Sequence, residues 1–302
     1  MKIILTSDLR KCPNIDGVRV VSADTIESYD GNPEVVALIC SRDVAQKCQH
    51  LNLPNLKLIQ LFSAGYDGID PKLLKSKGVT LCNAANVYNV GMAEFVVHSM
   101  LMSAKRYNKG IKNRLLRPFR NYRYITELAG KTVGILGAGN IGGQIAKRLE
   151  AFDMNVIGYD IADNPRPHFS KIYTQDTVKD FLQSSDYIVN CMPLFKATES
   201  LIDKQWFDNM KKNVTIVNVG RKQIFNNSDF LEFLRSNKEA TAVLDMFEKY
   251  PNPITNPYRR LSNVLVLPGV TAISQEINLK LINLIESNIG RIDSCNFENI
   301  IV

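Results

Sequence analysis

Histidine and cysteine, which proteins favour for acid–base catalysis and for binding transition metals, are scarce in this 302-residue chain. The histidines are His50, His98 and His168. The six cysteines (Cys12, Cys40, Cys48, Cys82, Cys191, Cys295) include no C-x-x-C pair, which favours buried thiols over disulfides or a zinc site. We therefore expect no metal site.

Long hydrophobic runs are also absent. No apolar stretch approaches the length needed to cross a bilayer, and the opening MKIILTSDLR reaches Asp8 too early for a signal peptide. These observations predict a cytoplasmic protein without a membrane partner.

Acidic residues are missing from one segment only. The formal net charge is +7, but residues 105 to 123 hold eight of the 37 basic residues and no acid, so the remainder is close to neutral. Such a run is typical of a solvated helix face, an anion-facing cleft wall or a partner surface. Nucleic-acid binding through this segment is a further hypothesis, but no nucleic-acid module is recognisable elsewhere and we expect no such partner.

The rest of the chain shows two series of short apolar runs alternating with helical patterns. The first series lies within residues 2–85, and the second, rich in Val and Ile, begins after Gly130. Strands with little polar alternation are typical of parallel sheets covered on both faces by helices. We expect further helices from about Gly91 to Leu116, ending before Pro118, and from about Ser274 to Asn288. With 45% apolar residues, the sequence predicts an α/β protein of two domains.

A glycine motif lies between the first strand of the second series and the helix after it. It reads Gly137-Ala138-Gly139-Asn140-Ile141-Gly142. The first glycine permits a tight turn, the second lets the backbone approach a pyrophosphate, and the third lets helix and strand pack closely. The diphosphate would bind the free N–H groups at the helix N-terminus. A glycine-rich turn without a ligand is the alternative.

The strand after this helix ends in Asp160, eighteen residues beyond Gly142. An acid there would accept hydrogen bonds from the adenosine ribose hydroxyls and would repel the 2′-phosphate of NADP. The motif therefore predicts NAD as the cofactor. Arg166 leaves NADP open, because it is placed to reach a 2′-phosphate.

Six stretches resemble the D-isomer-specific 2-hydroxyacid dehydrogenases in order and spacing. They are FSAGYDGID (62–70), NAANVYNVGMAE (83–94), ELAGKTVGILGAGNIG (127–142), SDYIVNCMPLFKATESLI (185–202), MKKNVTIVNVGR (210–221) and LDMFEKYP (244–251). The resemblance implies two Rossmann-like domains with parallel sheets. Residues 93–274 would form the NAD-binding domain, inserted into a discontinuous, flavodoxin-like substrate domain of residues 1–92 and 275–302.

The resemblance also implies roles for particular residues. The backbone of Ser63-Ala64-Gly65 would bind the substrate carboxylate, and Arg221 would bind carboxylate and carbonyl in the cleft. Asp245 would lie near the nicotinamide carboxamide. Further cofactor contacts would come from Met192, Pro193, Val219 and Gly220. The family usually forms dimers through the dinucleotide domains, so we expect a homodimer.

The proton donor of the family is missing. In the family a histidine, held by a glutamate, supplies the proton that must accompany hydride transfer. Gly269 stands at the histidine position and Tyr250 at the glutamate position. Tyr250 is a candidate donor if a cation such as Lys249 or Lys222 assists it, since a phenol has an ordinary pKa near 10. Alternatively, Tyr250 only fills space, or Glu94 and His98 form a relocated pair.

Two functions follow. The first is an NAD-dependent oxidoreductase acting on a small anionic 2-hydroxy or 2-keto acid, with an atypical or impaired proton donor. Retention of Arg221 favours it, although an arginine paired with a neighbouring acid would look the same. The alternative is a catalytically inactive protein of the same fold that senses NAD(H) or a metabolite. The sequence does not identify the acid.

Overall fold

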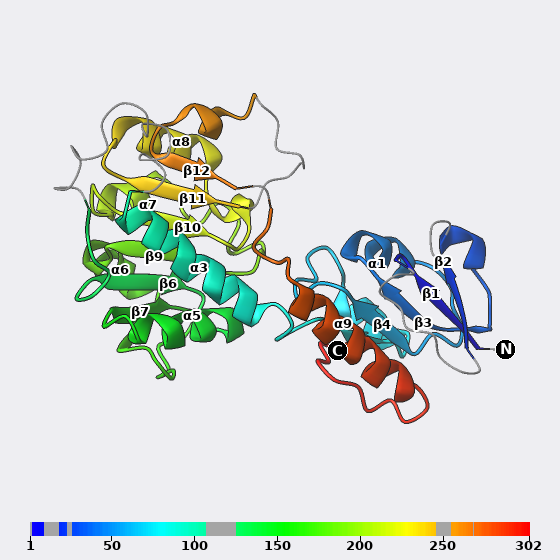
Figure 1. Ribbon diagram of the computed structural model, residues 1–302. Helices are drawn as coiled ribbons and strands as arrows, with labels where there is room; N and C mark the ends of the chain where they lie inside the picture. Colours follow the sequence, from blue (N-terminus) through cyan, green and yellow to red (C-terminus); the bar gives the residue numbers. More distant parts are fainter. Residues whose placement is uncertain (1, 9–17, 23–25, 107–124, 246–254, 268) are drawn as a thin grey trace. The chain divides into compact units, whose positions relative to one another are not determined.

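The computed structural model describes residues 2–8, 18–22, 26–106, 125–245, 255–267 and 269–302 (Figure 1). The chain divides into two compact units. One unit comprises Met1–Tyr88 and Ile273–Val302, and the other comprises Asn89–Ala272. The second unit is therefore an insertion into the sequence of the first.

The first unit has a five-stranded parallel sheet in the order β2-β1-β3-β4-β5. Its strands are β1 (Lys2–Thr6), β2 (Val18–Ser22), β3 (Val35–Cys40), β4 (Leu58–Leu61) and β5 (Thr80–Cys82). β3 and β4 are buried along their whole length, as expected for strands covered on both faces.

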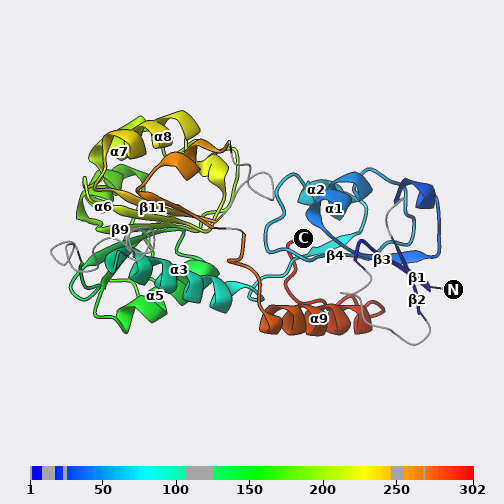
Figure 2. The same cartoon turned by 45° about the horizontal axis from the view of Figure 1, so that its top comes forward.

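Helices cover both faces of this sheet (Figure 2). α1 (Arg42–Cys48) and α2 (Pro71–Ser76) pack on one face, and α9 (Gln275–Gly290) packs on the other; a short 3-10 helix is η2 (Ile26–Tyr29). α9 buries Ile277, Leu281 and Ile285, which recur every four residues and so lie along one side of the helix. The C-terminal helix thereby completes a core that the first 88 residues begin.

The second unit has a seven-stranded parallel sheet in the order β12-β11-β10-β9-β6-β7-β8. Its strands are β6 (Thr132–Leu136), β7 (Asn155–Tyr159), β8 (Lys171–Tyr173), β9 (Tyr187–Asn190), β10 (Thr215–Asn218), β11 (Thr241–Leu244) and β12 (Val264–Val266). Six of these follow the apolar runs of the sequence. β8 was not predicted, because three residues at a sheet edge leave no periodic pattern.

Two layers of helices enclose this sheet (Figure 2). α3 (Asn89–Ala104) and α5 (Asn140–Glu150) lie on one face, while α6 (Val178–Ser184), α7 (Lys204–Asn209) and α8 (Asn227–Ser236) lie on the other. Three 3-10 helices are η4 (Gln175–Thr177), η5 (Lys222–Ile224) and η6 (Pro257–Arg260). On the α6–α8 side, the rings of Phe207, Phe225, Phe230 and Phe233 stack on one another.

The prediction of a helix from about Gly91 to Leu116 is wrong at its C-terminal end. α3 ends at Ala104, and Arg106 adopts a left-handed backbone with φ 56°. The Ala104 carbonyl accepts a hydrogen bond from the Thr126 N–H at 3.0 Å, so Thr126 lies at the end of the helix. Residues 107–124, which carry most of the basic run, lie outside the described residues.

The expected α/β class, with two Rossmann-like parallel sheets, is confirmed. One expectation about the thiols fails: Cys40, Cys48 and Cys82 are buried, but Cys295 is exposed. None of the described helices combines the length and the apolar character that a membrane crossing requires. Because all strands in each sheet are parallel, their carboxyl ends share one edge, where loops can gather functional groups.

Candidate functional site

The glycine motif forms the turn between β6 and α5. Gly137 has φ +94°, a conformation that side chains disfavour, and its N–H donates to the Tyr159 carbonyl at 2.9 Å. A Cβ placed on Gly142 would lie 2.1 Å from the Gly137 carbonyl oxygen, so only glycine lets the helix approach the turn this closely. The sequence therefore specifies a tight junction of strand and helix.

The first turn of α5 presents open amide groups. Gly139 is the N-cap residue and has no side chain to cap the helix. Among the described residues, the N–H groups of Gly139, Asn140, Ile141 and Gly142 donate to no acceptor; Gly143 is the first to bond back, to the Gly139 carbonyl at 2.8 Å. The space that a Cβ of Gly139 would enter is empty to 4 Å. Four amides and the helix dipole thus point at a space open to an anion.

Asp160 lies beside this turn, directly after β7. One of its carboxylate oxygens accepts from the Ala138 N–H at 3.1 Å, and the other accepts from the Ile161 N–H at 2.8 Å. The residue is half-buried, whereas Ile161 is 99% exposed. The carboxylate is therefore oriented by the glycine turn and keeps further acceptor capacity, because each oxygen has a second lone pair.

Two buried asparagines, which the sequence reasoning did not single out, organise the neighbouring loops. Asn190 ends β9 and Asn218 ends β10, and the Asn190 amide donates to the Asn218 side-chain oxygen at 2.9 Å. The Asn190 side-chain oxygen accepts from the Met192 N–H, and that of Asn218 accepts from the Gly220 N–H. The only sequence signal is that both strands end in Asn. This link fixes the loops carrying Met192, Val219 and Gly220 at the same sheet edge as the glycine turn.

Cys191 is a second overlooked residue of this edge. Its thiol donates to the carbonyls of Leu136 and Gly137, each at 3.2 Å. Burial raises the pKa of this thiol to about 12, and the negative charge of Asp160 adds to the shift. The group is therefore a neutral thiol at physiological pH, and it ties the loop after β9 to the glycine turn.

The remaining residues assigned to this unit follow β9 and β10. Pro193 is exposed, and its carbonyl accepts from the Thr198 hydroxyl at 2.8 Å. Arg221 is half-buried and is the N-cap residue of η5, directly after Gly220. It is thus placed at the carboxyl edge of the sheet, next to the loop that Asn218 orders.

Asp245 is fully buried at the end of β11 and is held by the segment after β12. One carboxylate oxygen accepts from the N–H groups of Gly269 and Val270, and the other accepts from the N–H and hydroxyl of Thr271. Gly269 has φ +80°, so a histidine at this position would adopt a strained backbone. Gly269 therefore belongs to a turn that wraps around the Asp245 carboxylate.

In the first unit, the loop after β4 holds Ser63, Ala64 and Gly65. The Ser63 hydroxyl donates to the Gly65 carbonyl at 2.7 Å, and the Asn83 amide donates to the Ala64 carbonyl at 2.7 Å. The N–H groups of all three residues donate to no acceptor in the described part of the chain. The carbonyls are thus occupied and the amides are open, which suits a carboxylate ligand.

The Tyr88 hydroxyl donates to the Phe62 carbonyl. Glu94 forms an ion pair with Arg148 at 3.8 Å, and His98 is exposed on the same helix. Tyr250 and Lys249 lie outside the described residues. No group of three or more His, Cys, Asp or Glu side chains within the described ranges is arranged to hold a metal ion.

These groups fit a dinucleotide diphosphate. The space above Gly139 admits a ligand against the backbone, the open amides of α5 supply donors, and the adjacent Asp160 carboxylate supplies an acceptor for ribose hydroxyls. A sulfate- or phosphate-sized group alone would use the amides but would leave the remaining acceptor capacity of the Asp160 carboxylate unused. The combination suits a phosphate joined to a hydroxyl-bearing sugar.

Comparison with known proteins identifies the same domain. The family described as "D-isomer specific 2-hydroxyacid dehydrogenase, NAD binding domain" matches residues 96–270. This match covers more than half of the chain and lies within the unit Asn89–Ala272. That unit is therefore an NAD binding domain, as predicted from the glycine motif.

Individual relatives agree. A D-3-phosphoglycerate dehydrogenase of Archaeoglobus fulgidus is 32% identical over 242 residues, covering 78% of this chain and 45% of the relative. A glyoxylate reductase of Thermofilum pendens is 30% identical over 249 residues, covering 78% of this chain and 71% of the relative. The chain thus spans less than half the length of the phosphoglycerate dehydrogenase and most of the reductase.

A solved structure matches both units. It is a probable 2-hydroxyacid dehydrogenase from Rhizobium etli in complex with NADP, HEPES and L(+)-tartaric acid, with a TM-score of 0.83, 21% sequence identity, and coverage of 100% of this chain and 98% of that chain. This likeness establishes the fold. Together, the domain match and the glyoxylate reductase confirm the resemblance seen in the motifs: the chain belongs to the D-isomer-specific 2-hydroxyacid dehydrogenase family.

Proposed function

We propose that the protein is an NAD-dependent oxidoreductase that exchanges a hydride with a small 2-hydroxy or 2-keto acid and uses an atypical or impaired proton donor. The observation that carries the proposal is the set of open α5 amides beside the oriented Asp160 carboxylate. Family membership links such a site to hydroxy-acid chemistry.

The cofactor residues take the following roles in this proposal. Gly139, Asn140, Ile141 and Gly142 bind the diphosphate through their N–H groups, while Gly137 shapes the turn. Asp160 accepts from the ribose hydroxyls and disfavours the 2′-phosphate of NADP. Bound NAD supplies a hydride acceptor at its nicotinamide ring. Further cofactor contacts are assigned to Met192, Pro193, Val219 and Gly220, and Asp245 is assigned to the region of the nicotinamide carboxamide.

Asp245 acts on the cofactor indirectly, through the backbone segment that it holds. Its carboxylate accepts four hydrogen bonds from the Gly269–Thr271 segment. With two oxygens and about four lone-pair sites, it has little capacity left for a ligand. We therefore propose that Asp245 shapes the segment at the position of the family's histidine and positions its backbone.

The substrate's carboxylate is bound, in this proposal, by two kinds of group. The open amides of Ser63, Ala64 and Gly65 suit a carboxylate without adding charge. Arg221 adds a guanidinium, whose planar fork matches a carboxylate or a 2-keto acid in bidentate geometry. The names of the relatives point to glyoxylate and phosphoglycerate-type acids as the first substrates to test.

The proton donor is the least conventional part of the proposal. Gly269 has no side chain to donate a proton, so we assign the role to the Tyr250 hydroxyl, assisted by a lysine such as Lys222 or Lys249. General acid–base help typically contributes about 10²- to 10⁴-fold to a rate, so turnover should be slower than with a histidine.

A second candidate function is an inactive NAD(H)- or metabolite-binding regulator of the same fold. The observation that favours it is the Gly269 turn, which is stabilised by Asp245 and has no ionisable side chain at the position of the family's histidine. This function needs the cofactor site but not a proton donor.

Absorbance at the NADH band distinguishes the two. The protein is mixed with NADH and, in turn, with glyoxylate, pyruvate, hydroxypyruvate and phosphohydroxypyruvate, and loss of reduced cofactor is followed. We expect measurable oxidation with at least one acid, at least about 100-fold slower in Tyr250→Phe. NADH binding without oxidation by any acid would instead establish the regulator.

Unchanged turnover in Tyr250→Phe would remove Tyr250 from the mechanism while leaving the reaction class intact. Tyr258→Phe is the matched control, because Tyr258 is a buried tyrosine that donates to the Asn227 side chain at 3.0 Å on the α8 side of the sheet. We keep homodimerisation as a proposal that rests on the family resemblance, and a cytoplasmic location as a proposal that rests on the sequence pattern.

A further inference from the structure

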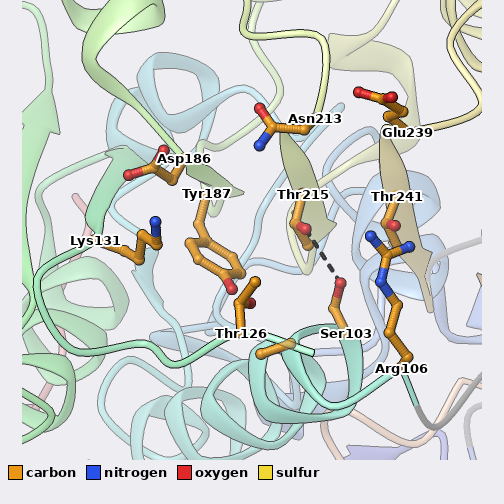
Figure 3. A pocket seen from close by; sticks show the side chains of 11 residues that line it. Ser103, Arg106, Thr126, Lys131, Asp186, Tyr187, Asn213, Thr215, Glu239 and Thr241 are labelled. Carbon is orange, nitrogen blue, oxygen red and sulfur yellow. Dashed lines mark hydrogen bonds between the residues drawn. The ribbon is translucent and has the colours of Figure 1, made fainter. Parts of the chain in front are cut away.

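A cavity lies at the amino edge of the sheet in the unit Asn89–Ala272 (Figure 3). It has a volume of about 90 Å³, and its residues stand at the starts of β6, β9, β10 and β11 or at the end of α3. The glycine turn and Asp160 follow the carboxyl ends of strands in the same sheet. Each strand is several residues long at about 3.3 Å per residue, so the cavity is separate from the proposed dinucleotide site.

The floor of the cavity consists of hydroxyl groups. Ser103, Tyr187, Thr215 and Thr241 are buried, and all four line the cavity. The hydroxyls of Ser103 and Thr215 lie 3.1 Å apart in a hydrogen bond that joins α3 to β10. Hydroxyl groups rotate to donate or to accept, so this floor can present donors to an anion.

Two cations stand at the sides of the cavity. The half-buried Arg106 extends from the end of α3 toward the start of β11, and the exposed Lys131 precedes β6 (Figure 3). The Lys131 ammonium has no hydrogen bond or ion pair within the described residues. The Arg106 backbone is anchored by its N–H bond to Ser103, and Thr126 closes the helix end beside it.

Two acidic side chains also line the cavity. Asp186 is neutralised by an ion pair with Lys211 at 2.8 Å and also accepts from the Thr132 N–H at 2.9 Å. Glu239 is exposed at the rim, and its carboxylate is turned away from the Arg106 guanidinium (Figure 3). Asp186 is therefore already compensated by Lys211, and Glu239 lies at the edge of the cavity.

We propose that this cavity binds a small phosphate-type oxyanion, either free phosphate or the phosphate end of a small monoester. One ordered water needs about 10–15 Å³ of such space, so the cavity holds several waters or one small oxyanion but no nucleotide. A tetrahedral anion accepts from the hydroxyl floor and from Arg106 and Lys131 on its sides at the same time. The site adds anion binding to a face of the domain that the proposed reaction does not use.

Calorimetry with inorganic phosphate and with methyl phosphate, at low ionic strength in chloride buffer, tests the proposal. Titrations are run with and without saturating NADH, which blocks the α5 amides. We expect phosphate binding that persists with NADH and weakens at least tenfold in Arg106→Gln and in Lys131→Gln, because a hydrogen bond to a charged group contributes about 1.5–3 kcal/mol. Thr215→Val should weaken it severalfold without changing charge.

Lys147→Gln is the matched control, since Lys147 is an exposed lysine of α5 with no partner in the described chain. Binding of methyl phosphate would extend the site to monoesters, and binding of inorganic phosphate alone would restrict it to the free ion. No phosphate binding, equal weakening in Lys147→Gln, or tighter binding of acetate than of phosphate would overturn the proposal.

The variant comparison does not depend on the dinucleotide site, so failure of NADH to bind would leave this test intact. Trp206 is the only tryptophan of the chain and is buried in the same unit, so its fluorescence verifies that each variant is folded.

Discussion

Asp245 shows how hydrogen bonds from one short segment allow a carboxylate to be fully buried. Transferring a carboxylate out of water costs several kcal/mol unless hydrogen bonds satisfy it. Here three N–H groups and one hydroxyl do so, all from Gly269, Val270 and Thr271. The left-handed backbone of Gly269 allows the turn to close around the carboxylate.

Replacing Asp245 by alanine should therefore destabilise the unit Asn89–Ala272 by about 3 kcal/mol or more, because several buried donors lose their acceptor at once. Urea unfolding followed by Trp206 fluorescence measures this. Asp208→Ala is the control: its carboxylate is exposed and, within the described part of the chain, pairs only with Lys204 at 3.3 Å, so its loss should cost less than about 1 kcal/mol. Equal effects of the two substitutions would contradict the structural role of Asp245.

At the residue scale, the glycine turn could be predicted from the sequence because the residues that must be glycine are close together in the chain. Gly137 and Gly142 meet each other across five positions, and the strand and helix around them are visible as patterns. The Asn190–Asn218 link and the Asp245 turn join residues 24 to 28 positions apart, and nothing in either segment alone reveals its partner. Hydrogen bonds between single polar residues that are distant in the sequence therefore could not be predicted from it.

At the scale of elements, the sequence predicts some helix ends correctly and others wrongly. The N-terminus of α9 was placed correctly at Ser274, whose hydroxyl accepts from the Ile277 N–H at 3.2 Å in an ordinary N-cap. The predicted C-terminus of α3 is wrong, because the prediction took Pro118 as the stop signal. The chain leaves the helix at Arg106 through a backbone conformation that no residue type there predicts.

The cap of α9 gives a pH-dependent prediction. Hydrogen bonds from its own backbone N–H and from Ser274 lower the pKa of the exposed Glu276. A lowered pKa in the folded state means that the charged carboxylate stabilises the helix above the unfolded-state pKa, and that this contribution is lost as pH falls through the folded-state value. Amide protection in α9 should therefore fall as the pH is lowered, and it should fall less in Glu276→Gln.

Hydrogen exchange of peptides covering 275–290, measured between pH 3 and 6 and corrected for intrinsic rates, reports this effect. Glu286→Gln on the same helix is the control, since Glu286 is exposed and has no partner among the described residues. Ser274→Ala should cost about 1 kcal/mol of local protection across that range. Identical pH profiles for Glu276→Gln and the unaltered protein would refute the assignment.

At the scale of the molecule, functional groups are distributed between the two edges of a parallel sheet. In the unit Asn89–Ala272, the carboxyl edge gathers the glycine turn, Asp160, and the loops fixed by Asn190 and Asn218, while the amino edge carries the proposed oxyanion cavity. Both sheets were predictable, because Val- and Ile-rich runs alternating with helices leave few other folds. The cavity was not, since its hydroxyls and cations come from five separate segments.

The central claim is that the first turn of α5 binds the diphosphate of NAD, and calorimetry on a pair of glycine variants tests it most directly. Gly139 and Gly143 both face empty space where a Cβ would stand, so alanine fits the fold at either position. The unaltered protein should bind NADH more tightly than NADPH. NADH binding should be at least tenfold weaker in Gly139→Ala and unchanged in Gly143→Ala. The account would be contradicted if neither NADH nor NADPH bound, or if the two variants had equal affinities for NADH.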